Sequence, residues 1–194
     1  MTSLFKPGSL QWYDEKWDLC QIDPVTMNTE LVMYAQQIVK FKSRYQFVED
    51  AIHVPWQMVA AIHCRESNLN FTCVLHNGEC IVGKRLKTKL VPQNRGPFPT
   101  WEDSAIDALS YKGLDHRDNW TVASILQACE LFNGLGYLRK HPDILSPYLW
   151  SKTDMYTKGK YTSDGKIDVN CVDQQPGVVA ILKALVLIGE FLPK

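Results

Sequence analysis

An apolar segment near the C-terminus determines the kind of core that this chain builds. Residues Val178 to Leu192 are apolar on nearly every side of a helical projection, although Lys183 interrupts them. A helix without a polar face is buried, so we expect this helix at the centre of a domain. The apolar run is too short to cross a bilayer, which takes about 20 residues. No membrane insertion is therefore expected.

Helical periodicity continues through much of the chain. The 194 residues predict one mainly α-helical (α+β) domain over residues 1–194. Residues 1–26 contain Trp12, Tyr13 and Trp17 without a clear period, and we expect an irregular arm there. Helical patterns and their start and stop signals predict helices at residues 28–46, 55–67, 100–109, 121–132 and 146–150. The helix at 100–109 opens with Thr100 and Asp103, which resemble a capping box.

A change of pattern after residue 70 predicts a small β-hairpin. Asn77-Gly78 stands between the apolar runs 71–75 and 80–82, and this dipeptide is a strong hairpin signal. Residues 92–100 and 155–166 are predicted to be loops.

Charge and cysteine content limit the possible functions. The chain carries 21 basic and 21 acidic residues, which argues against a nucleic-acid binder. No secretory signal is recognisable at its start, so we expect synthesis in the cytosol and six free, mostly buried cysteines. We expect a monomer, with no cofactor and no metal.

Glu66 is the leading candidate for a catalytic residue. It lies in the last turn of the helix predicted at 55–67, where the negative end of the helix dipole disfavours a carboxylate. Glycosidic cleavage needs a carboxylic acid that stays protonated near neutral pH, and apolar surroundings favour that form. A surface glutamate at a helix end is the alternative explanation.

Several short motifs resemble those of cell-wall-degrading enzymes. Glu66-Ser67 followed by Asn-Leu-Asn-Phe resembles the Glu-Ser motif of soluble lytic transglycosylases and goose-type lysozymes. Residues 131–137, Leu-Phe-Asn-Gly-Leu-Gly-Tyr, resemble their Tyr-Asn-x-Gly motif, with Phe132 in place of the tyrosine. Together with segments at 101–109, 146–151 and 156–161, they are similar to phage and bacterial endolysin-type proteins.

The resemblance implies a lysozyme-like domain with the hairpin beside an active-site cleft. Peptidoglycan glycan strands would be cut between N-acetylmuramic acid and N-acetylglucosamine, with Glu66 as the general acid. An enzyme of this type would accumulate in the host cytoplasm before it reaches the cell wall. The residues that the motifs assign to substrate binding are Ser67, His76, Asn133, Gly134 and Tyr137.

Three further residues are candidates from their surroundings in the sequence. Glu79 follows Glu66 by 13 residues and is the first choice for a second carboxylate, although aspartate is expected there. Glu102 and Asp103 are rivals whose place at a helix start already explains them. Tyr156 and Tyr161, flanked by polar residues, are predicted to be exposed and to stack on sugar rings.

Other chemistries remain open. A lytic transglycosylase would use the same acid without a second carboxylate. A cysteine peptidase or amidase could use Cys64, Cys73 or Cys80, and a zinc hydrolase could use His53 and His63, although no recognised metal spacing is present. A non-catalytic saccharide-binding or virion structural protein on a lysozyme-like scaffold is a further possibility.

Overall fold

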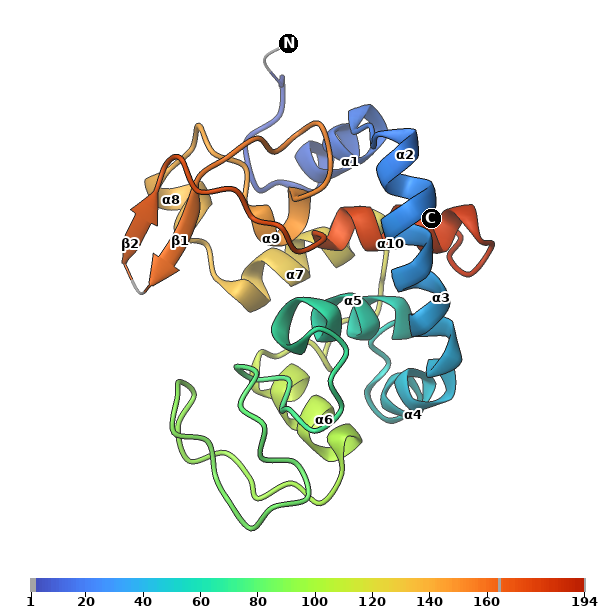
Figure 1. Ribbon diagram of the computed structural model, residues 1–194, viewed down its shortest axis with the longest axis vertical. Helices are drawn as coiled ribbons and strands as arrows, with labels where there is room; N and C mark the ends of the chain where they lie inside the picture. The colour runs from blue at the N-terminus through green and yellow to red at the C-terminus, as the bar shows by residue number, and fades with distance from the viewer. Residues whose placement is uncertain (1–2, 164, 194) are drawn as a thin grey trace. The chain divides into compact units, whose positions relative to one another are not determined.

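The structure, a computed structural model, describes residues 3–163 and 165–193. It is mainly helical, as expected from the helical patterns (Figure 1). The described residues also form a two-stranded antiparallel sheet. The chain divides into two compact units. Unit 1 comprises Met1–Gln36 and Trp120–Lys194, and unit 2 is the continuous segment Gln37–Asn119. The boundary between the units falls within one helix, α3 (Val32–Lys40).

Unit 1 contains the apolar helix near the C-terminus. Its elements are α1 (Leu10–Leu19), α2 (Pro24–Thr26), the π-helix η1 (Met27–Leu31), α7 (Val122–Asn133), α8 (Gly136–Lys140), α9 (Pro147–Trp150), β1 (Lys160–Ser163), β2 (Lys166–Asp168) and α10 (Val178–Leu187). α10 contacts α7, α9 and η1, and seven of its ten residues are fully buried, which confirms its central position. Burial of so much apolar surface is the main source of stability in such a unit.

Unit 2 consists of the end of α3, three further helices and a long irregular loop. The helices are α4 (Lys42–Ile52), α5 (Trp56–Ser67) and α6 (Trp101–Tyr111), and α4 contacts both of the others. Thr100 and Asp103 form the expected capping box at the start of α6. One expected helix at 28–46 is interrupted at Phe41, where the backbone leaves the helical region (φ −111°, ψ 16°) and α4 begins.

The prediction of an irregular N-terminal arm is wrong over Leu10–Leu19. Ser9 accepts a hydrogen bond from the Trp12 backbone N–H and starts α1. Trp12, Tyr13 and Trp17 fall on one side of this helix, and all three are buried. Their spacing covers an arc of about 140° at 100° per residue, which is one face of a helix.

The predicted hairpin at Asn77-Gly78 is also wrong. Residues 71–82 form turns, and the described strands are instead β1 and β2, within and after the loop expected at 155–166. Type I′ turns need a positive φ at both central residues, but only Gly78 of this pair has one. The Asn77 side-chain amide donates to Glu79 and to the carbonyl of Leu90, so it serves the loop and not a hairpin turn.

The cysteines are mostly free thiols, with one exception. Cys73 and Cys80 form a disulfide, which corrects the expectation that all six are free. Cys20, Cys64 and Cys129 form no disulfide and are buried, as expected, and Cys171 forms no disulfide and is half-buried.

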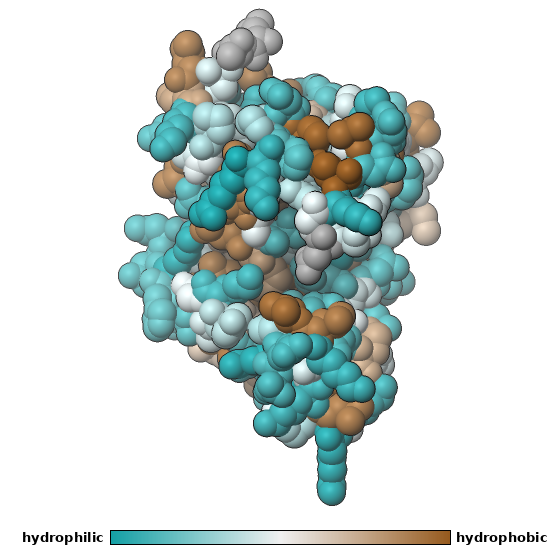
Figure 2. Space-filling model, turned by 90° about the vertical axis from the view of Figure 1, so that its left-hand side faces the viewer, coloured by the Kyte–Doolittle hydropathy of each residue, from teal (hydrophilic) through white to brown (hydrophobic). Residues whose placement is uncertain are grey.

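The lengths of the helices and the distribution of hydrophobic residues on the surface bear on membrane association. None of the helices in residues 3–163 and 165–193 combines the length and apolar composition that a bilayer crossing requires. On the face drawn in Figure 2, hydrophobic residues form separate patches among hydrophilic ones. Scattered patches of this kind are ordinary on protein surfaces.

Candidate functional site

Glu66 is the penultimate residue of α5, as predicted, and its side chain is half-buried. The helix preceding it is fully buried from Met58 to Cys64. His63, one turn earlier, lies in an aromatic cage, with its ring centroid 4.5 Å from that of Phe71 and 4.4 Å from that of Trp101. Glu66 therefore projects from the end of a rigid, well-packed helix.

The turn after Glu66 is strained. Asn68 and Leu69 are both left-handed, with φ of 51° and 62°. Asparagine tolerates this region, but a leucine there costs about 1–2 kcal/mol. The buried Leu69 side chain holds the turn in place. Strained backbone of this kind collects at functional sites because only the surrounding packing can maintain it.

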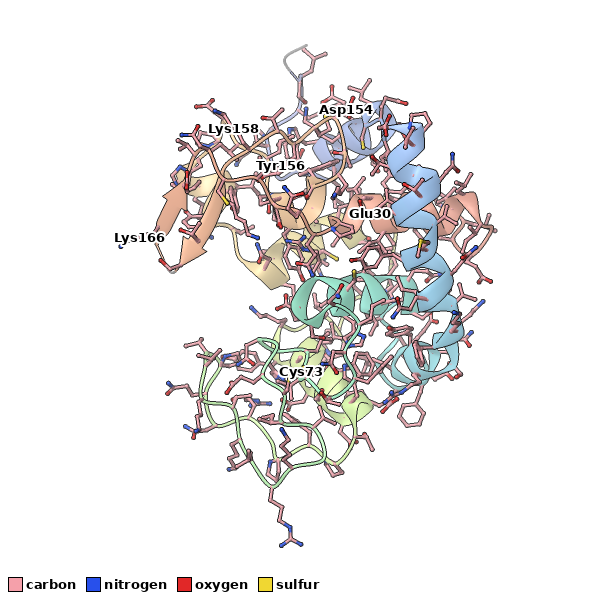
Figure 3. All side chains as sticks on the ribbon, viewed as in Figure 1. Glu30, Cys73, Asp154, Tyr156, Lys158 and Lys166 are labelled. Carbon is pink, nitrogen blue, oxygen red and sulfur yellow. A yellow bond between two sulfur atoms is a disulfide. The ribbon has the colours of Figure 1, made fainter. Side chains whose placement is uncertain are left out.

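The loop carrying Gly78 packs directly against the end of α5. A Cβ at position 78 would lie 2.6 Å from the Glu66 carbonyl oxygen, and Gly78 has φ +76°. Only glycine fits both conditions. The Cys73–Cys80 disulfide closes this loop (Figure 3 labels Cys73), and the Val74 N–H donates to the Glu79 carbonyl at 2.8 Å. The loop is therefore closed by covalent and hydrogen bonds and packs against the backbone of Glu66.

Glu79 has a structural role in the same loop. Its carboxylate accepts hydrogen bonds from the backbone N–H groups of Lys89 and Leu90, at 3.0 and 2.9 Å, and from the Asn77 amide. Desolvation acts to raise the pKa of Glu79, but these hydrogen bonds outweigh it and the net pKa lies below its usual value. Glu79 is thus an ionised side chain that binds the 89–90 segment to its own loop.

His76 is positioned inside unit 2. Its side chain is 1% exposed, its Nε2 lies 2.7 Å from Asp107 Oδ2, and its ring stacks on Phe98. Desolvation lowers the pKa of His76 despite the neighbouring Asp107. Asp107 also forms an ion pair with Arg95. This burial gives His76 a positioning role for the loop and leaves little ring surface for a sugar.

Ser67 and the two rival carboxylates make local contacts. The Ser67 hydroxyl lies 3.4 Å from the carbonyl oxygens of His63 and Asn70, so it supports the strained turn. Glu102 pairs with the Arg44 guanidinium through two hydrogen bonds. Asp103 belongs to the capping box of α6. The carboxylates of Glu102 and Asp103 therefore each have a structural role.

In unit 1, Asn133 is the last residue of α7 and Gly134 is its C-cap. Asn133 is exposed, and the Gly134 N–H donates to the Glu130 carbonyl at 2.8 Å. Gly134 has φ +108°, which favours glycine, and apart from its two chain neighbours no described residue has an atom within 4 Å of where a Cβ would be. Asn133 is therefore an exposed residue next to a glycine that has open space on its side-chain face.

Tyr137 and Tyr161 form a pair beside α8. The Tyr137 hydroxyl accepts a hydrogen bond from the Tyr161 N–H at 3.0 Å, and the rings meet edge to face at 5.1 Å. Tyr137 is buried, and burial raises the pKa of its hydroxyl. Tyr161 is half-buried and also contacts His141. Of the two, Tyr161 keeps a partly exposed ring.

The prediction that Tyr156 is exposed is wrong. Its side chain is in the core of unit 1, with 8% of the residue exposed (labelled in Figure 3). Its hydroxyl donates to the Gly159 carbonyl at 3.3 Å and accepts from the Asp173 N–H at 3.1 Å. Tyr156 therefore organises the segment that leads into β1.

Sequence patterns missed a buried carboxyl group in α7. Glu130 is 1% exposed, and the Tyr13 hydroxyl donates to it at 2.5 Å. Burial raises the pKa of Glu130 to about 7, although the hydrogen bond from Tyr13 opposes the shift. The available signal was a glutamate on an otherwise apolar helical face, four residues after Leu126 and seven after Ala123.

No protein-family model, curated protein or solved structure matches the chain. The chemistry of the site therefore rests on its own residues and contacts.

Thiol and metal chemistry find little support in the described residues. Burial raises the pKa of Cys64 to about 12, which disfavours the nucleophilic thiolate, and Cys73 and Cys80 are joined. Within residues 3–163 and 165–193, no group of three or more His, Cys, Asp or Glu side chains is arranged to hold a metal ion.

Proposed function

We propose that this chain is a peptidoglycan-degrading glycosidase with a lysozyme-like domain, in which Glu66 donates a proton to the leaving oxygen. One observation carries the proposal above all. The Gly78 loop packs against the Glu66 carbonyl so closely that only glycine is tolerated. A glutamate at a plain helix end needs no such support, whereas a general acid must be held in a fixed position.

Two other features support the same function. Leu69 maintains a strained turn immediately after Glu66-Ser67, within the motif shared with lytic transglycosylases and goose-type lysozymes. In unit 1, Asn133 is exposed and precedes Gly134, which has open space on its side-chain face. A residue that orients a sugar needs this accessibility. The substrate class, the cut between N-acetylmuramic acid and N-acetylglucosamine, and release from a host cytoplasm follow from this assignment.

A lytic transglycosylase outcome is the second candidate, and the contacts of Glu79 favour it. Hydrolysis needs a second carboxylate, either to activate water or to act as nucleophile. The carboxylate of Glu79 is committed to the Lys89 and Leu90 N–H groups, and its rivals Glu102 and Asp103 are also engaged. A transglycosylase needs no such group.

Mutation of Glu66 tests the proposal. Glu66→Gln keeps the shape of the side chain but cannot donate the proton, so clearing of purified cell walls should fall by at least about 100-fold. Glu49→Gln is the matched control, since Glu49 is also half-buried near the end of a helix in unit 2. It should keep near wild-type activity.

Product analysis separates the remaining outcomes. Mass spectrometry of digested peptidoglycan should find anhydro ends for a transglycosylase and reducing muramic ends for a hydrolase. Freed peptides would indicate an amidase and contradict both candidates. Wall binding without any cleavage by the wild-type chain would indicate a non-catalytic saccharide-binding protein.

A further inference from the structure

Unit 1 contains a cavity of about 400 Å³ beside the carboxyl group of Glu130. Trp12 and Lys16 of α1, Leu138 of α8 and Ile144 contribute to its lining. Small-molecule sites typically measure roughly 300–1,000 Å³, and they combine an apolar lining with a few placed polar groups. Both the size and the lining of this cavity fit that description.

Ser146 supplies the first polar group. It lines the cavity, is 1% exposed, and its Oγ has no hydrogen-bond partner among the described residues. Serine before a helix ordinarily caps it, but the Ser146 side chain makes no capping bond to α9. A buried hydroxyl without a partner destabilises a fold, and a ligand that supplies the partner would explain it.

Glu130 supplies the second polar group. One of its oxygens, Oε2, accepts the hydrogen bond from Tyr13. A carboxyl group can accept several hydrogen bonds, so this single bond leaves acceptor capacity for a ligand. Glu130 and Ser146 both line the cavity, which places an acceptor and a hydroxyl on its walls.

The charges around the cavity favour a neutral ligand. A cationic ligand would meet the ammonium group of Lys16, whose Nζ lies 5.7 Å from the centre of the Trp12 ring. An anionic ligand would meet the carboxyl group of Glu130, which loses charge only as the pH falls below about 7, the value to which burial raises its pKa. A molecule without charge avoids both penalties.

We propose that this cavity binds a neutral, mainly apolar small molecule whose hydroxyl or amide group hydrogen-bonds to Glu130 and Ser146. The site lies wholly within unit 1 and does not depend on the glycosidase activity assigned to Glu66. Its apolar lining would hold a ring or a short chain, and the two polar groups would select molecules with a hydrogen-bond donor.

Two matched probes test the proposal. Benzyl alcohol and ethylbenzene have nearly the same shape, but only benzyl alcohol carries a hydroxyl. In NMR titrations of the full chain, benzyl alcohol should bind with a Kd of roughly 1 mM or below and shift signals of Leu138, Ile144 and Ser146. Ethylbenzene should bind at least fivefold more weakly. Equal affinities, or no binding of either probe up to about ten times that concentration, would overturn the proposal.

Variants of the chain locate the site. Ser146→Ala should weaken benzyl alcohol binding about fivefold while leaving the melting temperature of the free protein equal or higher, because an unpaired hydroxyl is removed. Ser104→Ala is the control, since the buried Ser104 hydroxyl donates to the Trp101 carbonyl at 2.8 Å. It should lower the melting temperature and leave binding unchanged.

A variant that fills the cavity tests the site even if Ser146→Ala changes the affinity only slightly. Leu138→Trp places a larger side chain in the cavity and should abolish binding of both probes. Unchanged benzyl alcohol affinity in both Ser146→Ala and a folded Leu138→Trp variant would show that the probe binds elsewhere and would refute the site.

Discussion

Gly78 is held by two independent constraints at the scale of single residues. Its φ of +76° lies in the left-handed region, and its missing side chain leaves room for the Glu66 carbonyl oxygen. The first constraint concerns only the backbone of the loop. The second ties the loop to the residue that we assign as the acid, so the two can be separated by mutation.

Gly78→Ala should destabilise the protein by roughly 2–4 kcal/mol, because it adds backbone strain and a clash with a backbone oxygen. Gly113→Ala is the control. Gly113 has φ +67°, but apart from its chain neighbours no described residue has an atom within 4 Å of a Cβ there, so a loss of about 1 kcal/mol in the free energy of unfolding is expected. Urea unfolding measures both. Wall-clearing activity should fall for Gly78→Ala but not for Gly113→Ala. If the two variants lose the same stability and the same activity, the contact between Gly78 and Glu66 is unimportant.

At the scale of elements, the loop between Cys73 and Cys80 is held by several constraints at once. The disulfide and the Val74–Glu79 backbone hydrogen bond close it, and Val74 of the loop packs with Ile81 and Phe98 in a small apolar cluster. Closing a short loop stabilises a protein mainly by restricting its unfolded chain.

Replacing both Cys73 and Cys80 by serine should cost roughly 2–3 kcal/mol of the free energy of unfolding, as expected for a loop of this length. A reducing agent should have the same effect on the wild-type chain and none on the double variant. Cys171→Ser, which removes a free half-buried thiol, should change little. Wild-type unfolding that is insensitive to reduction would contradict the stabilising role of this disulfide.

Helices were the elements that sequence patterns predicted best. The start of α6 was predictable because Thr100 and Asp103 satisfy backbone groups within one turn. α10 was predictable because its apolar character leaves no alternative to burial. The hairpin at Asn77-Gly78 was mispredicted because the Asn77 amide makes contacts with Leu90, 13 residues away, which no local pattern reveals.

The candidate site was predictable only in part, for the same reason. The position of Glu66 at a helix end followed from local signals. The burial of Tyr156 and His76 depends on partners distant in sequence, Asp173 for the first and Asp107 for the second. Polar neighbours along the chain indicated exposure of Tyr156, but hydrogen bonds formed in the fold satisfy its hydroxyl instead.

At the scale of the whole molecule, each unit buries a titratable group in its less charged form. Burial raises the pKa of Glu130 to about 7 in unit 1 and lowers the pKa of His63 to about 4 in unit 2. Between pH 4.5 and 7 the folded chain holds the Glu130 proton more tightly than the unfolded chain, so this group makes stability fall as the pH rises. His63 acts oppositely between pH 4 and 6.5, because the unfolded chain binds its proton more tightly.

These opposing effects lead to a prediction for Glu130→Gln. Relative to the wild type, this variant should become more stable as the pH rises from 4.5 to 7, by up to about 3 kcal/mol. Urea unfolding at several pH values measures the difference, in which the contribution of His63 cancels. A difference that does not change with pH would mean that Glu130 is not desolvated in the folded protein.

The order of the two units along the chain has a consequence for synthesis. Unit 2 is one continuous stretch, whereas unit 1 is assembled from segments on both sides of it. A ribosome therefore completes unit 2 while unit 1 still lacks α10, the helix that fills its centre. Nascent chains can fold the Glu66 loop early, but the half that carries Asn133 must wait until translation has passed residue 187.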